Sequence, residues 1–318
     1  MSTAVDHAPE AGGTPGAGKR RMSDRARGER NLGWMLSAPA FLIMIGVTLF
    51  PILYALYNSL FRFRLTDPDS KAFVGLNNYV TALSDGYWWQ ATGVTALITV
   101  ITVVVELVLG FGIALLMHRV VLPRRTLRTI VLIPYSIITV VSAYAWLYAF
   151  RVDTGFVNHW ANTLTFGAFG ADFNWFGSFW PAVTVISMSE IWKTTPFMSL
   201  LLLAGLAQID GAMEEAAKVD GASFWQRLTK VVLPNMKAAV MVALLFRTLD
   251  AFRIFDNPFI MTGGANDTST LSMVVYRQTI ERMDIGLGSA LSVLLFLYVV
   301  IIAFIFVKVF NVNLTEGK

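Results

Sequence analysis

Charged side chains inside long apolar stretches are the residues of this sequence most able to do chemistry. They are Glu106, Glu190, Lys193, Arg247, Asp250, Arg253 and Asp256. A charge within a membrane span is costly, so such residues usually face a helix-bundle interior or a water-filled cavity. Glu190 and Lys193, or Arg247 and Asp250, are three residues apart and can pair on one helix face. Neutralisation within the chain and a role in a solute pathway are therefore both open for them.

Other reactive constellations are missing from the sequence. The chain has no cysteine, which excludes disulfides, thiolate metal sites and cysteine nucleophiles. Its histidines, His7, His118 and His159, are too far apart for a metal-ligand cluster. Gly13–Lys19 has the G-x4-G-K spacing of a phosphate-binding loop, but Arg20 stands where Ser or Thr should ligate Mg²⁺. We therefore expect no catalytic residue, metal or cofactor here; if ATP drives this protein, another chain binds it.

The composition is that of a membrane protein. Of 318 residues, 55% are hydrophobic and only 14% are charged, whereas a soluble domain carries about 25% charged residues. The mean hydropathy of +0.59 points the same way. The small basic excess, 25 Lys and Arg against 21 Asp and Glu, is explained better by a bilayer than by nucleic acid once the positions of the charges are considered.

Six apolar stretches each reach the ~20 residues that a helix needs to cross ~30 Å of hydrocarbon. They are residues 34–60, 93–117, 129–150, 180–204, 239–261 and 287–310. Because backbone groups in lipid must pair internally, each stretch is predicted to be a helix. The fold class predicted is thus an all-α membrane protein with six transmembrane helices, whose even number puts both termini on one side.

The distribution of basic residues orients these helices. Of the 25 Lys and Arg residues, 16 lie on the side of the termini and six on the opposite side, so both termini are predicted to be cytoplasmic. Residues 1–32, rich in Gly, Pro, Ala and Arg, are interpreted as a flexible cytoplasmic tail that is not cleaved. The membrane domain is expected at 33–311 and a short cytoplasmic end at 312–318.

The loop between the fourth and fifth stretches has the local signals of a short helix, a sharp turn and a second helix. Asp210 can cap the first helix, and Gly221 supplies the left-handed residue that ends it. Ser223 with Gln226 makes a capping box for the second helix, which Pro234 should end. On these signals alone, an amphipathic pair lying against lipid headgroups is the better interpretation.

The loop also contains a sequence motif. The pattern E-A-A-x3-G-x9-(I/V)-x-L-P is filled by Glu215, Ala216, Ala217, Gly221, Val231, Leu233 and Pro234. It resembles the signature of the permease subunits of binding-protein-dependent ABC importers, in which the loop (206–238 here) docks into the ATPase subunit. The resemblance implies an ATPase-coupling surface with Glu215 as its polar anchor. Its residues would be Glu214, Glu215, Ala216, Ala217, Asp220 and Gly221.

Further motifs extend the resemblance over nearly the whole chain after the tail. Phe73–Tyr79 matches F-x-G-L-x-N-Y, Leu132–Tyr135 continues the match, and Met261–Gly264 is followed by Thr268 and Thr270. These stretches resemble sugar-importer permeases of the maltose and glycerol-phosphate type, in the larger-subunit role, and most of all permeases of trehalose importers. A disaccharide such as trehalose or maltose is the implied solute, with glycerol phosphate or an amino acid as alternatives.

The resemblance also implies a solute pathway and partners. The pathway residues expected, where hydroxyl-matching groups meet aromatic faces, are Tyr135, Thr139, Glu190, Thr194, Asp250, Arg253, Ile254 and Asn257. Tyr135 is equally well explained as an interfacial aromatic. The implied partners are a second permease, which Glu106 is expected to contact, two ATPase subunits that bind ATP and Mg²⁺, an extracytoplasmic sugar-binding protein and the lipid bilayer. The implied location is the plasma (inner) membrane of a prokaryote.

Two other functional classes compete with the transporter. An intramembrane enzyme would need carboxylates arranged as a general acid/base pair, but Glu106, Glu190 and Asp250 lie on three different predicted spans. A passive channel would need symmetric repeats or a polar pore-lining periodicity, and the sequence shows neither. Both classes therefore rank well behind the ABC permease.

Overall fold

The computed structural model describes residues 24–119, 124–167, 170 and 172–309. The predictions for Gly13–Lys19, His7 and the C-terminal end 312–318 concern residues outside this part. The chain divides into two units, Met1–Leu53 and Tyr54–Lys318, which are described separately. Helix α1 (Asp24–Asn58) makes up the described part of the first unit and continues into the second. Residues 24–32, predicted as part of a flexible tail, are therefore helical.

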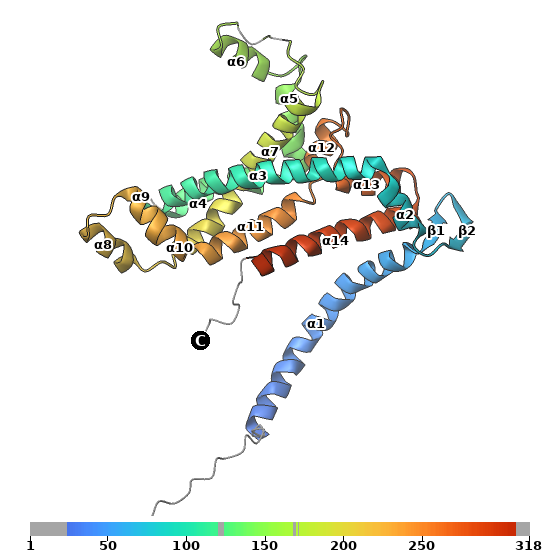
Figure 1. Ribbon diagram of the computed structural model, residues 1–318, viewed down its shortest axis with the longest axis horizontal. Helices are drawn as coiled ribbons and strands as arrows, with labels where there is room; N and C mark the ends of the chain where they lie inside the picture. The colour runs from blue at the N-terminus through green and yellow to red at the C-terminus, as the bar shows by residue number, and fades with distance from the viewer. Residues whose placement is uncertain (1–23, 120–123, 168–169, 171, 310–318) are drawn as a thin grey trace, which may run out of the picture. The chain divides into compact units, whose positions relative to one another are not determined.

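The second unit is largely helical (Figure 1). After the end of α1 its elements are β1 (Phe61–Arg64), β2 (Asp67–Phe73), α2 (Asn77–Ser84), α3 (Gly86–Arg119), α4 (Arg124–Ser136), α5 (Thr139–Phe150), α6 (Val157–Leu164) and α7 (Phe179–Leu206). They continue as α8 (Gly211–Val219), α9 (Phe224–Arg227), the π-helical turn η1 (Leu228–Val232), α10 (Leu233–Asn235), α11 (Lys237–Ala251), α12 (Asp256–Met261), α13 (Leu271–Tyr276), the π-helical turn η2 (Arg277–Glu281) and α14 (Ile285–Val309).

The hairpin β1–β2 departs from the all-α prediction. Its antiparallel strands pair Phe61 with Phe73 and Arg64 with Asp67. The F-R-F-R sequence of β1 alternates apolar and polar residues with the period of a strand, a signal too short to stand out beside the neighbouring helices. The ammonium of Lys71 on β2 lies 5.0 Å from the ring centroid of Phe61, so a cation–π contact adds to the pairing.

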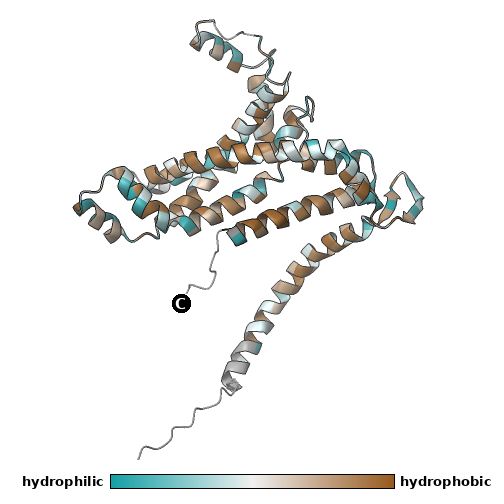
Figure 2. Ribbon diagram, in the orientation of Figure 1, coloured by the Kyte–Doolittle hydropathy of each residue, from teal (hydrophilic) through white to brown (hydrophobic). Residues whose placement is uncertain are grey.

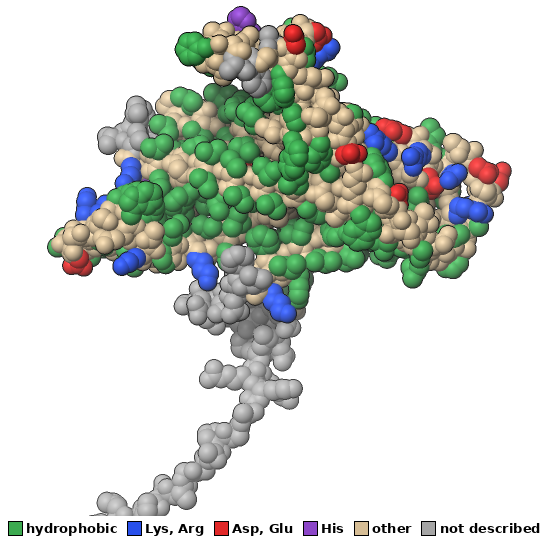
Figure 3. Space-filling view, turned by 45° about the horizontal axis from the view of Figure 1, so that its top comes forward, with side chains coloured by type: hydrophobic (Ala, Val, Ile, Leu, Met, Phe, Trp, Pro, Cys, Tyr) green, Lys and Arg blue, Asp and Glu red, His purple; other side chains and the backbone are tan. Residues whose placement is uncertain are grey.

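Three described helices, α1, α3 and α14, are long and apolar enough to cross a bilayer by themselves. The number rises to five if the bent pairs α4–α5 and α7–α8 each count as one span. Hydrophobic residues follow α3 and α14 along most of their lengths (Figure 2). On one face of the molecule they form a band, and most charged side chains lie toward its ends (Figure 3). This pattern is typical of a protein whose middle part contacts lipid.

Two of the predicted helices are interrupted, and the prediction of 129–150 as one continuous helix was wrong. The stretch 129–150 breaks after Ser136, and its two parts are bent by 79°. The stretch 239–261 breaks between Ala251 and Asp256. Pro258 then lies in the first turn of α12, where the missing amide hydrogen costs nothing. Irregular backbone at membrane depth is tolerated where it lines a cavity. Both interruptions lie beside the cavity described below.

Helices α3 and α7 form the centre of the second unit, and α11 packs against both. At Gly110 of α3 the two helices approach closely: a Cβ there would lie 2.9 Å from Cγ of Met198 on α7. Small residues at such crossings let helix backbones pack in lipid, where hydrophobicity alone does not drive association. The α3–α7 contact is the frame that holds both the cavity and the loop described next.

Candidate solute cavity and coupling loop

A cavity of about 410 Å³ opens where the two helix interruptions meet α7. Its walls come from α4, α5, α7, α11, α12 and the break between the last two. It is lined by Tyr135, Thr139, Glu190, Lys193, Thr194, Asp250, Arg253, Ile254, Phe255, Asp256 and Asn257. All eight residues predicted for a solute pathway are among them, although they come from three separate sequence regions. The structure therefore brings the predicted set together in one place.

The guanidinium of Arg247 on α11 is the centre of an ion cluster behind this cavity. It is fully buried, and its Nε donates to Oε2 of Glu106 on α3 at 2.5 Å while its Nη2 donates to Oε1 of the same carboxylate at 3.0 Å. It also donates to Oε1 of Glu190 on α7 at 2.9 Å and to Oδ2 of Asp250 at 2.7 Å. The five N–H donors of an arginine allow this triple pairing. One cation thus joins carboxylates from three helices.

Polar side chains extend the cluster to the cavity wall. The amide Nδ2 of Asn257 donates to Oε2 of Glu190 at 2.6 Å, and the hydroxyl of Thr194 donates to Oε1 of Glu106 at 2.6 Å. Asp250 is the accessible member, since its side chain is 65% exposed while that of Arg247 is fully enclosed. The cluster therefore has a buried cationic centre and an accessible acidic edge.

These contacts correct some of the pairings predicted from spacing. Arg247 pairs with Asp250 as predicted, but Glu106 pairs with Arg247 inside the chain, and its predicted contact to a partner permease was wrong. Glu190 bonds to Arg247 and not to Lys193, whose ammonium lies 5.6 Å from the ring centroid of Tyr135. A planar guanidinium can bind several carboxylates at once. Arg247 therefore pairs with Glu190, which the i,i+3 spacing had assigned to Lys193.

Lys193, Phe255 and Asp256 line the cavity but were not in the predicted set. Two of them are intramembrane charges, so the signal that found Glu190 and Asp250 could have found them as well. Tyr135 stacks on Phe197 with ring centroids 5.3 Å apart and remains partly exposed to the cavity. An aromatic face held in this way is available for contact with an apolar sugar face.

The loop from 206 to 238 has the local geometry that its sequence predicted. The Asp210 carboxylate accepts a hydrogen bond from the amide of Ala212 at 3.0 Å and caps α8. Gly221 has φ of +77°, the left-handed conformation that follows a helix end. Ser223 and Gln226 form a reciprocal capping box at the start of α9. These three predictions are confirmed.

Pro234 does not end the second helix, so that prediction was wrong. It lies within α10, and the chain passes through η1 and α10 and then, after Met236, into α11. In η1 the amide of Leu233 donates to the carbonyl of Leu228, five residues earlier. This wider turn relaxes the usual i→i−4 ladder just before a residue that has no amide hydrogen to contribute. The proline is accommodated without terminating the helical run.

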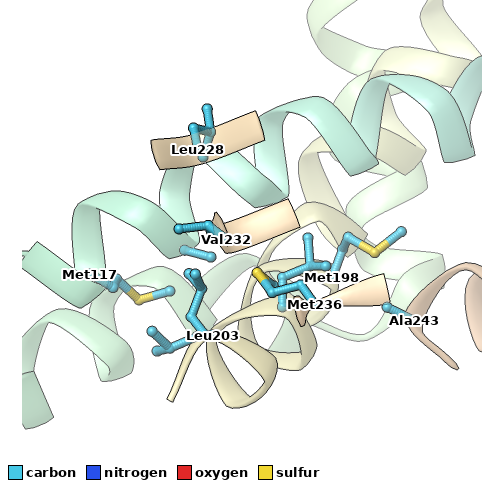
Figure 4. Close-up of a cluster of buried hydrophobic side chains, with 10 residues drawn as sticks. Met117, Met198, Leu203, Leu228, Val232, Met236 and Ala243 are labelled. Carbon is cyan, nitrogen blue, oxygen red and sulfur yellow. The ribbon is translucent and has the colours of Figure 1, made fainter. Parts of the chain in front are cut away.

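The two halves of the loop differ in how they are held. Leu228, Val232 and Met236 of the second half pack into a buried cluster with Met117 of α3 and Met198 of α7 (Figure 4). Helix α8, in the first half, has no buried residue along its described length. The second half is therefore anchored to the helix bundle, and the first half projects from it.

The predicted coupling residues lie on this projecting half. Glu215, Ala216, Asp220 and Gly221 are exposed, and Ala217 is half-buried. Glu214 is turned inward: its carboxylate lies 3.3 Å from Nη2 of Arg119 on α3 and 3.9 Å from Nε of Arg227. Large apolar side chains are exposed beside them, with Val219 at 88%. An exposed apolar and acidic surface of this kind is typical of a docking site.

The family to which the chain belongs follows from its sequence match. The family described as "Binding-protein-dependent transport system inner membrane component" matches residues 106–315, which include the cavity, the ion cluster and the loop. The chain belongs to this family, and it is a permease component of an ABC importer, not an enzyme.

Particular relatives and a solved structure agree with this class. The trehalose transport system permease protein SugA of Mycobacterium tuberculosis is 50% identical over 290 residues, 91% of this chain and 92% of that protein. The trehalose/maltose transport system permease protein MalF of Thermococcus litoralis is 36% identical over 282 residues, 88% and 94% of the two chains. The crystal structure of a bacterial ABC transporter for the acidic polysaccharide alginate has a chain with a TM-score of 0.76 and 20% identity, covering 92% of this chain and 100% of that one. At 20% identity, this structural similarity supports the fold alone.

Proposed function

We propose that the chain is the transmembrane subunit of an ATP-driven importer that moves a sugar, a disaccharide such as trehalose or maltose, into the cytoplasm by alternating access. The observation that carries the proposal is the convergence of all eight predicted pathway residues on one cavity at two helix interruptions. The names of the relatives that are 50% and 36% identical support the solute, since both concern trehalose transport.

The chemistry of the cavity suits a hydroxyl-rich solute. Its volume of about 410 Å³ falls within the ~300–1,000 Å³ of small-molecule sites. Sugar hydroxyl groups both donate and accept hydrogen bonds. The carboxylate of Asp250 would accept from them, the cations of Lys193 and Arg253 would donate, and the ring of Tyr135 would contact an apolar sugar face.

The proposal includes a topology of six spans with both termini in the cytoplasm. The spans would be α1, α3, α4 with α5, α7, α11 with α12, and α14. Helix α11 has 15 residues, about 22 Å at 1.5 Å per residue, so it needs α12 to complete a crossing. Residues 1–32 and 312–318 would be cytoplasmic, 33–311 would form the permease domain in the inner membrane of a prokaryote, and 206–238 would face the cytoplasm.

The proposed complex contains two permeases, two ATPase subunits that bind ATP and Mg²⁺, and an extracytoplasmic sugar-binding protein. The ATPase contact would be made by Glu214, Glu215, Ala216, Ala217, Asp220 and Gly221. The exposure of α8 beside its firmly packed neighbour η1 supports this assignment. Hydrolysis of ATP would move α8, and the packed second half of the loop would pass that movement to α3 and α7.

The test is purification of the chain in mild detergent with whatever accompanies it, followed by transport in lipid vesicles. We expect an ATPase and a second permease to copurify. We also expect labelled trehalose or maltose to accumulate only with ATP and a binding protein. The proposal is contradicted if the chain purifies alone after mild crosslinking. It is equally contradicted if the vesicles take up glycerol phosphate or an amino acid and no disaccharide.

A further inference from the structure

Arg247 is hidden from the cavity, although two of its three carboxylate partners line it. Its side chain is fully enclosed, whereas Glu190 and Asp250 are both part of the cavity wall. Glu190 in turn holds the amide of Asn257, which also lines the cavity. The contacts therefore run from a buried guanidinium to three polar groups in the wall.

We propose that Arg247 is a positioning residue for the solute, which acts through Glu190 to orient the amide of Asn257 and leave its oxygen free for a substrate hydroxyl. This inference rests on the proposed function, in which the cavity admits a sugar. Arg247 itself touches no substrate in this scheme. Its role is to fix the orientation of Glu190 and Asp250. That orientation determines which hydrogen-bonding groups the cavity wall presents to the solute.

The orientation of Asn257 follows from hydrogen-bond chemistry. A carboxylate can only accept, so the amide group that faces Oε2 of Glu190 must be the NH2 group. Oδ1 is then directed away from Glu190, and it is buried without a hydrogen-bond partner among the described residues. An acceptor left unsatisfied in a buried place is costly, and a hydroxyl donor from a solute or a water would relieve that cost.

Asp250 is held in a similar way. Its Oδ2 accepts from Arg247 at 2.7 Å while its side chain remains largely exposed. One carboxylate oxygen is thus fixed by the cluster, and the group stays accessible to the cavity. Asp250 thus gives the wall an accessible acceptor and Asn257 gives a buried one, and the positions of both depend on Arg247.

The charges of the wall favour an uncharged solute. Three carboxylates line the cavity, those of Glu190, Asp250 and Asp256, against the two cations of Lys193 and Arg253. An acidic sugar would place its own charge beside this acidic excess and would be disfavoured. The ligand class assigned is therefore a neutral, hydroxyl-rich molecule that donates hydrogen bonds to Asn257 and Asp250.

The experiment compares the sugar moved per ATP hydrolysed by the complete reconstituted importer, using labelled trehalose as the probe. Arg247→Lys keeps the charge, but a single ammonium cannot reproduce the forked contacts of the guanidinium. We expect it to lower the ratio by about tenfold, as for the loss of one hydrogen bond to a charged group. Arg128→Lys, a matched exchange at an exposed position of α4, should leave the ratio unchanged.

The decisive comparison repeats Arg247→Lys in a chain that already carries Asn257→Ala. If Arg247 acts through Asn257, Arg247→Lys should lower the ratio less in this background than in the unaltered chain, because one of the two acceptors that it positions is already gone. Equal losses in both backgrounds, or a normal ratio for Arg247→Lys alone, would overturn the proposal. A general structural role would instead reduce the amount of assembled complex, which size-exclusion chromatography measures, and would leave the ratio per complex unchanged.

A second variant keeps the test decisive if Arg247→Lys does not assemble. Glu190→Gln can still accept from Arg247, but its NH2 group would donate to Oδ1 of Asn257 and reverse that amide. Glu190→Gln and Asn257→Ala should then each lower the ratio to a similar level, and their combination should be no worse. Additive losses would overturn the proposal. If the unaltered importer moves no disaccharide with ATP, the proposed function itself fails, which is a distinguishable result.

Discussion

Two arginine–glutamate contacts join α3 to other parts of the chain, and their surroundings are opposite. Near the middle of α3, Glu106 pairs with Arg247 at 2.5 Å, and both side chains are fully enclosed. At the end of α3, Arg119 lies 3.3 Å from Glu214, with the two side chains 46% and 33% exposed. The same pair of residue types therefore occurs once fully buried and once partly exposed to water.

The difference shows which of the two regions pairs its charges entirely within this chain. The cluster around Arg247 satisfies its charges with partners from α3, α7 and α11, all within this chain. Helix α8, which carries Glu214, has no buried residue and leaves Glu215 exposed. The cluster around Arg247 therefore needs no other protein to pair its buried charges, while the loop has a surface suited to a partner.

Removal of the buried cation should have the largest effect on stability. Arg247→Met would leave Glu106 and Glu190 enclosed without their counter-ion, which costs about 3–5 kcal/mol. We expect a strong fall in thermal stability and in the amount of folded protein recovered in detergent. Arg253→Met is the control, because Arg253 is exposed and, among the described residues, its Nε donates only to the carbonyl of Leu249. Equal stability of the two variants would show that the cluster does not stabilise the fold.

Charge reversal at the projecting helix should disturb transport and not folding. Glu215 is exposed, so Glu215→Lys should be inserted and folded normally. At an interface, a wrong charge costs several kcal/mol, and we expect uptake to fall at least about tenfold while ATP hydrolysis continues. Uptake and hydrolysis are measured together in vesicles. Asp69→Lys, at an exposed position of the hairpin, serves as control, and normal uptake by Glu215→Lys would refute the coupling role of α8.

The turn between α8 and α9 should show a smaller, conformational effect. Gly221 has φ of +77°, and no atom lies within 4 Å of the place that a Cβ would take, so Gly221→Ala would cost about 1 kcal/mol through backbone strain alone. Gly211→Ala is the matched control, since it also meets no neighbour and lies at the start of α8 without a positive φ. Hydrogen exchange of the α8 amides should accelerate in the first variant only. Equal exchange in both would show that the turn does not depend on glycine.

The exposed ion pair should matter least. Glu214→Gln removes the pairing with Arg119, and surface pairs contribute about 0–1 kcal/mol. We expect the midpoint of thermal unfolding to change little and the small difference to disappear in high salt. A loss as large as that of Arg247→Met would show that burial does not distinguish the two contacts, and the comparison would fail.

The loop could be predicted from sequence because its signals are local. The cap at Asp210, the left-handed Gly221 and the Ser223–Gln226 box each depend on residues within a few positions of one another. Backbone hydrogen-bonding chemistry at this range is nearly independent of the rest of the fold. Pro234 was the exception, because the π-helical turn that accommodates it depends on packing of Leu228 and Val232 against distant helices.

The ion cluster could not be predicted in the same way. Glu106 and Arg247 are 141 residues apart, and spacing rules suggest partners only at three or four positions. The cavity set came from two kinds of signal. Glu190, Asp250, Arg253 and Asn257 are polar residues within apolar stretches, and the family resemblance supplied Tyr135, Thr139, Thr194 and Ile254. The sequence placed an interruption of the fifth stretch at Pro258, whereas the structure has it at 252–255, because the proline fits in the first turn of a new helix.

The chain's lack of cysteine makes one measurement especially direct. Ala216→Cys on α8 would introduce the only thiol of this subunit, and Thr66→Cys in the turn of the hairpin is the exposed control. Each variant is treated with a short thiol-to-amine crosslinker in the purified complex, and the products are identified by mass spectrometry. We predict that Ala216→Cys is joined to an ATPase subunit and Thr66→Cys is not. If Ala216→Cys yields no ATPase adduct while the complex is intact, the central claim that α8 docks on the ATPase is contradicted.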